Sequence, residues 1–502
     1  MKAIFFFILS LLVTAQITHD EKPIAPDRPN VIIILSDDLG WGDLGCFGQQ
    51  KIQTPHIDRL AHEGMIFTQA YAGSSVCAPS RSSLMQGLHQ GHARVRGNSF
   101  HSYRESLQPE DYTLAIFMQE AGYKTGLFGK WGLANHDQPG IPTNKGFDEF
   151  FGYLNQRHAH CFYPEFLYDN TRRVFYPENG DHHLHKNYSR ISEYNPEGSV
   201  QPNGILDPKE AKNAFDEYSA RSLAFVRENY ASPFFLYLAY TLPHGPLIAP
   251  SLSFYQYKNW PQPYKEWAAM VSHMDAAVGE LMRLLEELNI DENTLIIFAS
   301  DNGDSSHGYE PRYKQEDPNI NISDFFQSSS PTRGRKGGSF DGSFHVPALA
   351  WWPNKIAKGQ NSDHLWAFWD VLPTVADIIG KKLPGRTDGI SLKPTLLASG
   401  QQEKHPYLYW EFNQVQVIRS DRWLARRPNG GDVELYDLTS DPEQLDDISS
   451  KHPDIVGKMN TYFSVSHTPS NVWPSPGETA EEFAERRKAN NLPDRPNNIA
   501  NF

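Results

Sequence analysis

The chain has 502 residues, more than one ordinary core holds, so we expect one large domain accompanied by a smaller one. Its hydrophobic content of 39% and aromatic content of 13% indicate a globular protein rather than a disordered or fibrous one. The formal net charge of −14 argues against nucleic acid or an anionic membrane surface as a partner, but not against an anionic substrate, because a few cations inside a cleft outweigh a distant surface.

The first 15 residues follow the plan of a secretory signal peptide. Lys2 is followed by the apolar run 4–13 and by the small-residue cleavage motif Val13-Thr14-Ala15. The apolar run is too short to span a membrane, and no later segment is apolar enough to do so. We therefore expect an exported protein, periplasmic or secreted, with no membrane partner.

The chain contains three cysteines, Cys46, Cys77 and Cys161. So few cysteines exclude a disulfide scaffold in an exported protein. If Cys77 carries chemistry, Cys46 and Cys161 are either a disulfide pair or two buried free thiols, and the sequence leaves both alternatives open.

Short apolar runs, separated by stretches with helical periodicity, predict an α/β fold. Residues 31–35 form a continuous β-branched run, which is typical of a strand buried on both faces of a parallel sheet. The clearest helical pattern covers residues 267–288. Further strand-like runs occur at residues 234–239, 295–299 and 346–352. This alternation favours a large, mostly parallel central sheet flanked by helices.

From about residue 401 the pattern changes to short alternating segments, which predict a small antiparallel sheet. The segments lie at residues 407–412, 423–426 and 433–438. A closing helix is expected near residues 454–463, and the polar, Pro-rich remainder is expected to wrap the surface or to be partly disordered. We therefore divide the chain into a signal peptide (1–15), a large domain (28–400), a C-terminal α+β subdomain (401–463) and a polar tail (464–502).

Two of the expected strands end in polar pairs. Asp37 and Asp38 come after the first strand, and Asp301 and Asn302 come after the strand at residues 295–299. Ligands bind beyond the carboxyl ends of parallel strands, so we expect both pairs at one edge of the sheet. Either pair alone would more simply cap a helix or solvate a loop. Together, their oxygen atoms suit a hard divalent cation, with calcium preferred over a softer metal.

Residues 77–81 read Cys77-Ala78-Pro79-Ser80-Arg81, directly before an apolar helical stretch. A cysteine at such a junction is by default a small buried hydrophobe. The order Cys-x-Pro-Ser-Arg, however, is the one in which sulfatases oxidise the cysteine to formylglycine. Over residues 28–460 the chain resembles the formylglycine-dependent sulfatases, whose fold is the alkaline phosphatase-like α/β fold. The resemblance implies one calcium ion held by Asp37, Asp38, Cys77, Asp301 and Asn302.

The same resemblance implies which residues are catalytic. Arg81 lies one helical turn after Cys77, so its side chain can return toward that residue. Lys130 stands in the Gly-Lys-Trp motif, and Lys336 stands in a Gly-rich turn. Three such cations would stabilise charge on a sulfate group in the transition state. His244 matches the His-x-Pro element of the family, which implies that it protonates the leaving alcohol.

The implied reaction is the hydrolysis of a sulfate ester. The hydrate of formylglycine 77 attacks sulfur in line, His244 with Lys336 protonates the departing alcohol, and a covalent enzyme sulfate forms. The second hydroxyl of the hydrate then expels sulfate. The expected partners are a sulfated saccharide and a formylglycine-generating maturation enzyme. Two alternatives stay open: a phosphodiesterase or phosphonate monoester hydrolase on the same fold, and a silent protein that binds sulfated glycans.

The chain departs from the family at one position. Sulfatases commonly read Gly-Lys-Trp-His, with the histidine acting on the formylglycine hydrate. Here Gly132 follows Trp131, so the group that replaces this histidine is not identified by the sequence.

Three residues are expected to contact the saccharide: Arg157, His160 and His307. Residues 157–163 combine a cation, imidazoles and aromatic rings, which can hydrogen-bond hydroxyl groups and stack on a sugar face. The alternative is that these rings pack an ordinary loop and that His158 and His160 are solvated.

Overall fold

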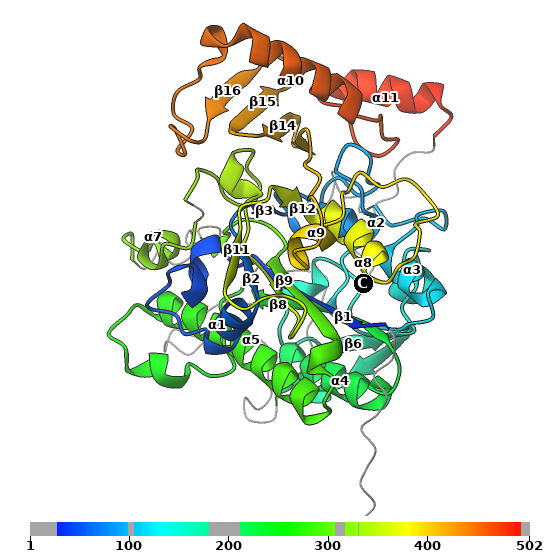
Figure 1. The fold of residues 1–502 in the computed structure, drawn as a ribbon, viewed down its shortest axis with the longest axis vertical. Coiled ribbons are helices and arrows are strands. Elements are labelled where there is room, and N and C mark those ends of the chain that lie inside the picture. The colour runs from blue at the N-terminus through cyan, green and yellow to red at the C-terminus, as the bar shows by residue number, and fades with distance from the viewer. Residues whose placement is uncertain (1–27, 99–104, 180–210, 307–316, 330, 493–502) are drawn as a thin grey trace, which may run out of the picture.

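The centre of the molecule is a mixed ten-stranded sheet (Figure 1). The computed structural model describes residues 28–98, 105–179, 211–306, 317–329 and 331–492. The strands lie in the order β11 (Gln360–Ser362), β2 (Met65–Phe67), β10 (Ala348–Trp351), β9 (Thr294–Ser300), β1 (Asn30–Asp37), β8 (Phe234–Pro243), β4 (Lys124–Lys130), β5 (Glu149–Tyr153), β6 (Phe166–Asp169) and β7 (Arg172–Phe175). The five strands from β9 to β5 run parallel to one another. The predicted α/β fold with a mostly parallel sheet is confirmed.

The central strands are buried on both faces. Every residue of β1, β8 and β9 is buried, as the continuous apolar runs predicted. The predicted run at residues 346–352 contains strand β10, but this strand pairs antiparallel with both β9 and β2. A run of apolar residues predicts a strand without fixing its direction, so the sequence could not show this reversal.

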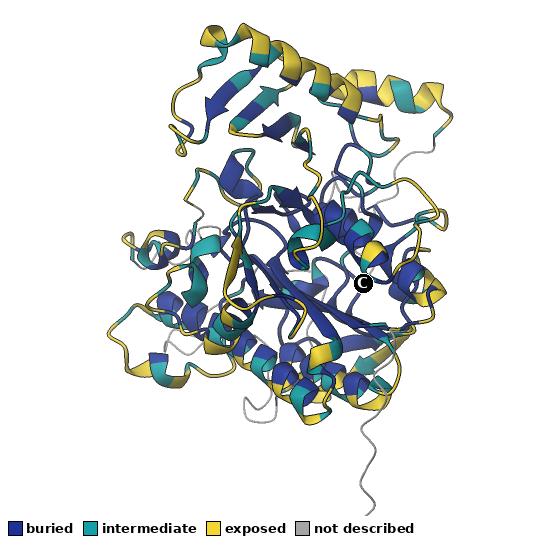
Figure 2. Cartoon of the chain, viewed as in Figure 1, coloured by how far each residue is buried: buried dark blue, intermediate teal, exposed yellow. Residues whose placement is uncertain are grey.

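Helices cover both faces of the sheet, and the sheet separates two hydrophobic cores. Val31, Ile33 and Leu35 pack with α2 (Cys77–Gln86), α3 (Leu114–Glu120), α8 (Val371–Ile378) and α9 (Lys393–Leu396). Ile32 and Ile34 point to the other face, against α1 (Pro55–Glu63), α4 (Ala214–Asn229), α5 (Gln262–Glu287) and α7 (Ile322–Phe326). Helix α5 confirms the predicted helix. Figure 2 shows the buried strands between helices whose outer sides are exposed.

A second sheet follows the large one in the chain. Strands β13 (Leu408–Phe412), β14 (Val415–Ser420), β15 (Trp423–Pro428) and β16 (Glu434–Asp437) form an antiparallel meander. Helix α10 (Pro453–Ser466) covers one face. The other face packs on Tyr71, Phe344 and Trp369 of the large domain, beside the short strands β3 (Ala70–Tyr71) and β12 (Trp366–Ala367). The predicted small antiparallel sheet with a closing helix is confirmed.

The segment expected to be a polar tail has structure of its own. Helix α11 (Ala480–Ala489) begins with a capping box between Thr479 and Glu482, and Trp473 is buried. Both features were missed by the sequence analysis. The division of the chain at residues 400 and 463 stays a prediction.

The described residues contain no disulfide, and Cys46, Cys77 and Cys161 are free thiols. Within the same residues, no helix is both long and apolar enough to cross a membrane. The expected signal peptide lies outside the described part of the chain.

Candidate active site

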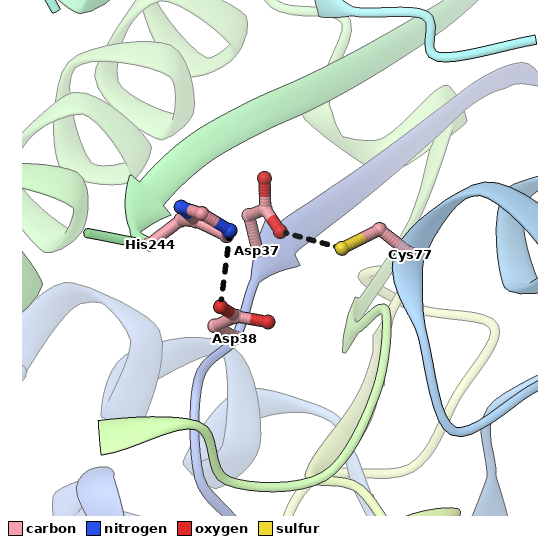
Figure 3. A group of neighbouring side chains, drawn as sticks. All are labelled: Asp37, Asp38, Cys77 and His244. Carbon is pink, nitrogen blue, oxygen red and sulfur yellow. Dashed lines mark hydrogen bonds and ion pairs between the residues drawn. The ribbon is translucent and has the colours of Figure 1, made fainter. Parts of the chain in front are cut away.

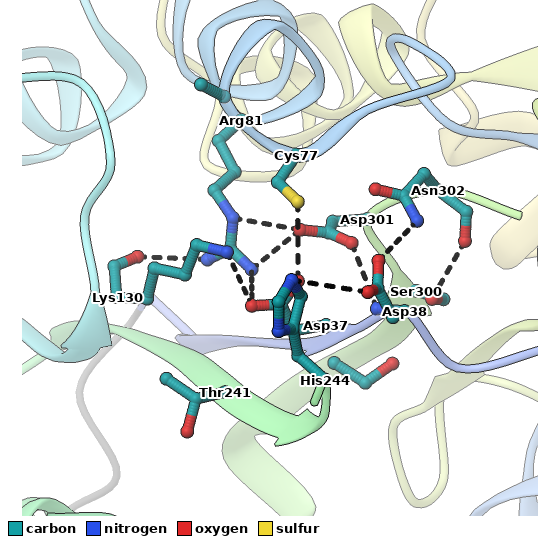
Figure 4. A network of polar contacts seen from close by, with 12 residues as sticks. Asp37, Asp38, Cys77, Arg81, Lys130, Thr241, His244, Ser300, Asp301 and Asn302 are labelled. Carbon is teal, nitrogen blue, oxygen red and sulfur yellow. Dashed lines mark hydrogen bonds and ion pairs between the residues drawn. The ribbon is translucent and has the colours of Figure 1, made fainter. Parts of the chain in front are cut away.

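The ends of four neighbouring parallel strands bring the predicted site residues together (Figure 4). Asp37 is the last residue of β1, and Asp301 directly follows β9, its neighbour. On the other side of β1, His244 follows β8, and Lys130 ends β4. The sequence therefore predicted this edge of the sheet correctly.

Cys77 faces this edge from the first residue of α2 (Figure 3). Its side chain is fully buried, and Sγ donates a hydrogen bond of 3.5 Å to Asp37 Oδ1. Burial, with Asp301 adding to it, raises the pKa of the thiol to about 12. An unmodified Cys77 is therefore protonated at neutral pH and is a poor nucleophile.

Arg81 lies one turn further along α2 and is held by three hydrogen bonds. Its Nε and Nη2 atoms donate to Asp301 Oδ2 at 3.0 and 2.8 Å, and Nη1 donates to the Lys130 carbonyl at 2.9 Å. The guanidinium is fully buried. Its position is therefore fixed before any ligand arrives.

Lys130 and Lys336 each contact a different carboxylate. Lys130 Nζ lies 2.6 Å from Asp37 Oδ2, and Lys336 Nζ lies 2.6 Å from Asp38 Oδ1. Burial alone would raise the pKa of Asp37, but Lys130, His244 and Arg81 outweigh it and lower this pKa. Burial also opposes ionisation of Asp38, and Lys336, His244 and Asn302 hold its pKa far below the usual range. Both carboxyl groups are ionised.

Two further features of the acidic pairs fit a bound cation. Asn302 Nδ2 donates to Asp38 Oδ1 at 2.8 Å, whereas Asn302 Oδ1 is buried without a hydrogen-bond partner among the described residues. Burial raises the pKa of Asp301 to about 6, and the charge of Asp37 adds to the effect. A free amide oxygen beside three crowded carboxyl groups is the donor set of a hard divalent cation. Asp37, Asp38, Cys77 and His244 present ligand atoms within 4.8 Å of one another.

His244 is neutral in this arrangement. Its Nδ1 lies 2.6 Å from the Gly245 carbonyl, which can only accept, so Nδ1 carries the proton. Nε2 faces Asp38 Oδ2 at 3.4 Å (Figure 3). Burial lowers the pKa of His244 to about 4, although Asp38 partly opposes the shift.

The residues expected to contact a saccharide separate into three cases. His160 stacks on His244, with ring centroids 4.1 Å apart. Arg157 is half-buried, and its guanidinium makes no hydrogen bond or ion pair within the described residues. His307 lies outside the described residues. His158 is fully buried against Tyr153 and Phe166, so it packs the loop rather than being solvated.

A cavity of about 230 Å³ is lined by residues 96–98, residues 411–414 of the C-terminal sheet and residues 473, 474 and 476. Its lining includes Arg96, Asn98, Glu411, Gln414 and Trp473. Asn98 Oδ1 accepts a hydrogen bond of 3.0 Å from the backbone N–H of Ala78. The cavity therefore approaches the residue next to Cys77, and the C-terminal sheet supplies part of its wall.

His89, His92 and Asp388 form a second group of side chains of the kinds that ligate metals, but the two imidazole rings are not oriented to share one ion. The rings of His89 and His92 stack 4.1 Å apart with planes 28° from parallel. Lone pairs lie in the ring planes, so those of two nearly parallel rings do not converge on one ion. His92 Nδ1 instead bonds Asp388 Oδ2 at 2.8 Å, with Arg386 Nη2 3.2 Å from the same nitrogen.

Comparison with known proteins gives consistent matches. A family model described as Sulfatase matches residues 29–381, and one described as N-sulphoglucosamine sulphohydrolase, C-terminal, matches residues 336–463. N-acetylgalactosamine-6-sulfatase from Canis lupus familiaris is 30% identical over 80% of this chain and 72% of its own length. Arylsulfatase G from Rattus norvegicus is 30% identical over 83% and 79%. The crystal structure of Ps i-CgsB in complex with k-i-k-neocarrahexaose shares the fold, with a TM-score of 0.71 at 24% identity over 94% of this chain and 99% of that one.

Proposed function

Since the chain belongs to the sulfatase family and is a sulfuric ester hydrolase, we propose that it desulfates a saccharide by means of a formylglycine at position 77 and one calcium ion. The proposal rests on the environment of Cys77. Its fully buried side chain faces a cluster of three carboxylates and three cations, and its thiol is too weakly acidic to react as a thiolate. This environment therefore suits a formylglycine at position 77 better than an unmodified cysteine.

The cofactors would supply what these side chains lack. A hydrated formylglycine provides a hydroxyl nucleophile together with a second hydroxyl that can expel sulfate, and calcium provides positive charge for the sulfate oxygens. We assign the calcium to Asp37, Asp38, Asp301, residue 77 and the buried Oδ1 of Asn302. A formylglycine-generating enzyme is the implied maturation partner, and export by a signal peptide is the implied route.

The protein's own cations would hold the sulfate group. Arg81, Lys130 and Lys336 are matched by Asp301, Asp37 and Asp38, so the site is close to neutral before a divalent cation binds. A bound dication would therefore make the site attractive to a sulfate ester. Because the cations are already fixed, they need no reorganisation when charge spreads over the sulfate oxygens.

His244 and Lys336 would serve the leaving group. His244 is neutral in the free site, but a nearby sulfate anion favours its charged form. The proton would then be taken up together with the substrate and returned to the departing alcohol. Lys336, whose side chain is 16% exposed, lies on the same carboxylate as His244 and is placed to assist.

A saccharide is supported as the substrate class by three observations. Among the relatives is an N-acetylgalactosamine-6-sulfatase, and the Ps i-CgsB structure holds k-i-k-neocarrahexaose. His160 stacks directly on His244, where it can reach a group next to the ester. The cavity beside Ala78 combines the ring of Trp473 with polar side chains, a mixture suited to sugar rings and their hydroxyl groups.

The test is a matched pair of aryl esters, one sulfate and one phosphate, assayed with protein matured by a formylglycine-generating enzyme. We expect kcat/KM to favour the sulfate. Preference for the phosphate or a phosphonate would establish the phosphodiesterase alternative. Unmodified Cys77 in native protein that turns over neither ester would instead favour the silent glycan-binding alternative.

A further inference from the structure

We propose that Gln156 contacts the reacting sulfate group, using its side-chain amide in the space that a side chain at position 132 would otherwise fill. This inference rests on the sulfate ester chemistry proposed above. Gln156 would thus act beside Gly132, the position at which sulfatases commonly have a histidine.

Gln156 and Gly132 lie against each other at the same edge of the sheet. A Cβ atom built on Gly132 would stand 2.6 Å from Gln156 Oε1 and 3.9 Å from Arg81 Cδ. Gly132 also has a φ of +78°, a conformation that side chains rarely adopt. The positive φ favours glycine at position 132, and the Gln156 amide lies in the space beside Arg81 that a side chain there would take.

The backbone fixes this arrangement. Gly132 follows β4 and Gln156 follows β5, and these strands are parallel neighbours. Beyond the strands, the N–H of Trp131 donates to the Tyr153 carbonyl at 2.9 Å, and the N–H of Gly132 donates to the Leu154 carbonyl at 3.1 Å. The amide of Gln156 thus belongs to the same rigid edge as Lys130.

The amide is buried and unpaired among the described residues. Gln156 is 3% exposed, and neither Nε2 nor Oε1 makes a hydrogen bond within the described residues. Buried amides are nearly always paired, since an unpaired one destabilises the folded state. A buried amide held next to Arg81 is instead arranged for a ligand that arrives with the substrate.

The chemistry of an amide defines its role. Nε2 can donate to an anionic sulfate oxygen, and Oε1 can accept from a neighbouring hydroxyl group. An amide does not titrate near neutral pH, so Gln156 binds and orients but exchanges no proton. The replacement of an imidazole by an amide leaves His244 and Lys336 as the proton-carrying groups.

The test replaces Gln156 with methionine, which keeps the length of the side chain and removes both polar atoms. For Gln156→Met we expect kcat/KM on an aryl sulfate to fall about 10- to 100-fold, as for loss of a buried hydrogen bond to a charged group. Competitive inhibition by inorganic sulfate should weaken by about the same factor. The Tm should stay equal to that of the parent protein or rise, because an unpaired amide has been removed. Gln156→Glu, which adds a negative charge beside the sulfate, should lose more activity.

Gln90 provides a matched control. It is fully buried, its amide also has no partner among the described residues, and it lies beyond the end of α2 opposite to Cys77. Gln90→Met should leave kinetics and sulfate inhibition unchanged.

Unchanged kinetics and sulfate inhibition in Gln156→Met would overturn the inference. A loss of activity accompanied by a lower Tm would also overturn it, in favour of a packing role. If the parent protein turned over no sulfate ester, the proposed function would fail instead. The inference about Gln156 would then be tested by comparing how far inorganic sulfate raises the Tm of Gln156→Met and of the parent.

Discussion

Lys130 Nζ lies 2.6 Å from Asp37 Oδ2, although the strands that carry them, β4 and β1, are separated by β8. Both side chains are buried, with exposed fractions of 0% and 1%. The ion pair therefore crosses a whole strand at the edge of the sheet, and it joins the cation expected to hold sulfate to a carboxylate expected to hold calcium.

Removing the two lysines should have unequal effects on stability. Lys130→Met leaves Asp37 buried without its nearest cation, which should lower the free energy of unfolding by about 3–5 kcal/mol. Lys336→Met should cost clearly less, because the Lys336 side chain is partly exposed and water can approach Asp38. Both variants should lose activity. Urea unfolding in the presence of a chelator measures the difference, and equal stabilities would contradict the burial argument.

Removal of calcium should abolish turnover and lower the Tm. Without the ion, three carboxyl groups share one buried site, and Asn302 Oδ1 has no partner within the described residues. Asn302→Ala should weaken calcium binding, measured by calorimetry, because it removes one neutral oxygen ligand. Calcium added back to chelated protein should restore activity better than magnesium. Full activity in chelated protein would show that the metal has no catalytic role.

Glu266→Gln should make the protein less sensitive to alkaline pH. Burial raises the pKa of Glu266 from its ordinary value of 4.5 to about 7. The stabilising contribution of this group is therefore complete below about pH 4.5 and is lost as the pH rises through 7. The Tm of the variant should equal that of the parent at pH 5 and exceed it at pH 8. A constant difference across this range would contradict the assigned shift.

Replacement of Arg157 or His160 should lower kcat/KM on saccharide substrates more than on aryl sulfates. Arg157→Ala should lower kcat/KM for a sulfated saccharide by roughly tenfold, the effect of one charged hydrogen bond, and should spare an aryl sulfate. His160→Phe keeps the stack on His244 while removing the polar atoms, so it separates sugar contact from support of His244. Equal losses on both substrates, or none on either, would leave the segment with a structural role only.

Most of the site could be predicted because its residues are fixed by strand ends. A buried β-branched strand is visible as a continuous apolar run, and its carboxyl end marks Asp37 and Asp301. His244 also follows a buried strand, but only its match to the His-x-Pro element of the family singled it out. Cys77 and Arg81 were identified by the Cys-x-Pro-Ser-Arg motif of the family, and the spacing of one helical turn indicates only that Arg81 can reach residue 77. These positions depend on local patterns, which a single sequence contains.

Other features were missed. One of them depends on contacts between distant segments, and two are local. Gln156 is identified only by the unpaired state of its amide and by the space at Gly132, neither of which has a sequence signature. Strand β14 follows a two-residue turn, Asn413-Gln414, in which both residues have positive φ, but the turn lacks the glycine that usually marks it. Helix α11 carries a Thr479–Glu482 capping box that the sequence analysis overlooked.

The most direct test of the proposed chemistry is the mass of the peptide that contains residue 77, taken from protein whose sulfatase activity has been measured in the same preparation. We expect Cys77 to have lost its sulfur and to carry an aldehyde oxygen, in a fraction of molecules that rises with specific activity across preparations. Cys77→Ala should have no activity and an unchanged Tm. Fully active protein in which residue 77 is only an unmodified cysteine would contradict the proposed mechanism.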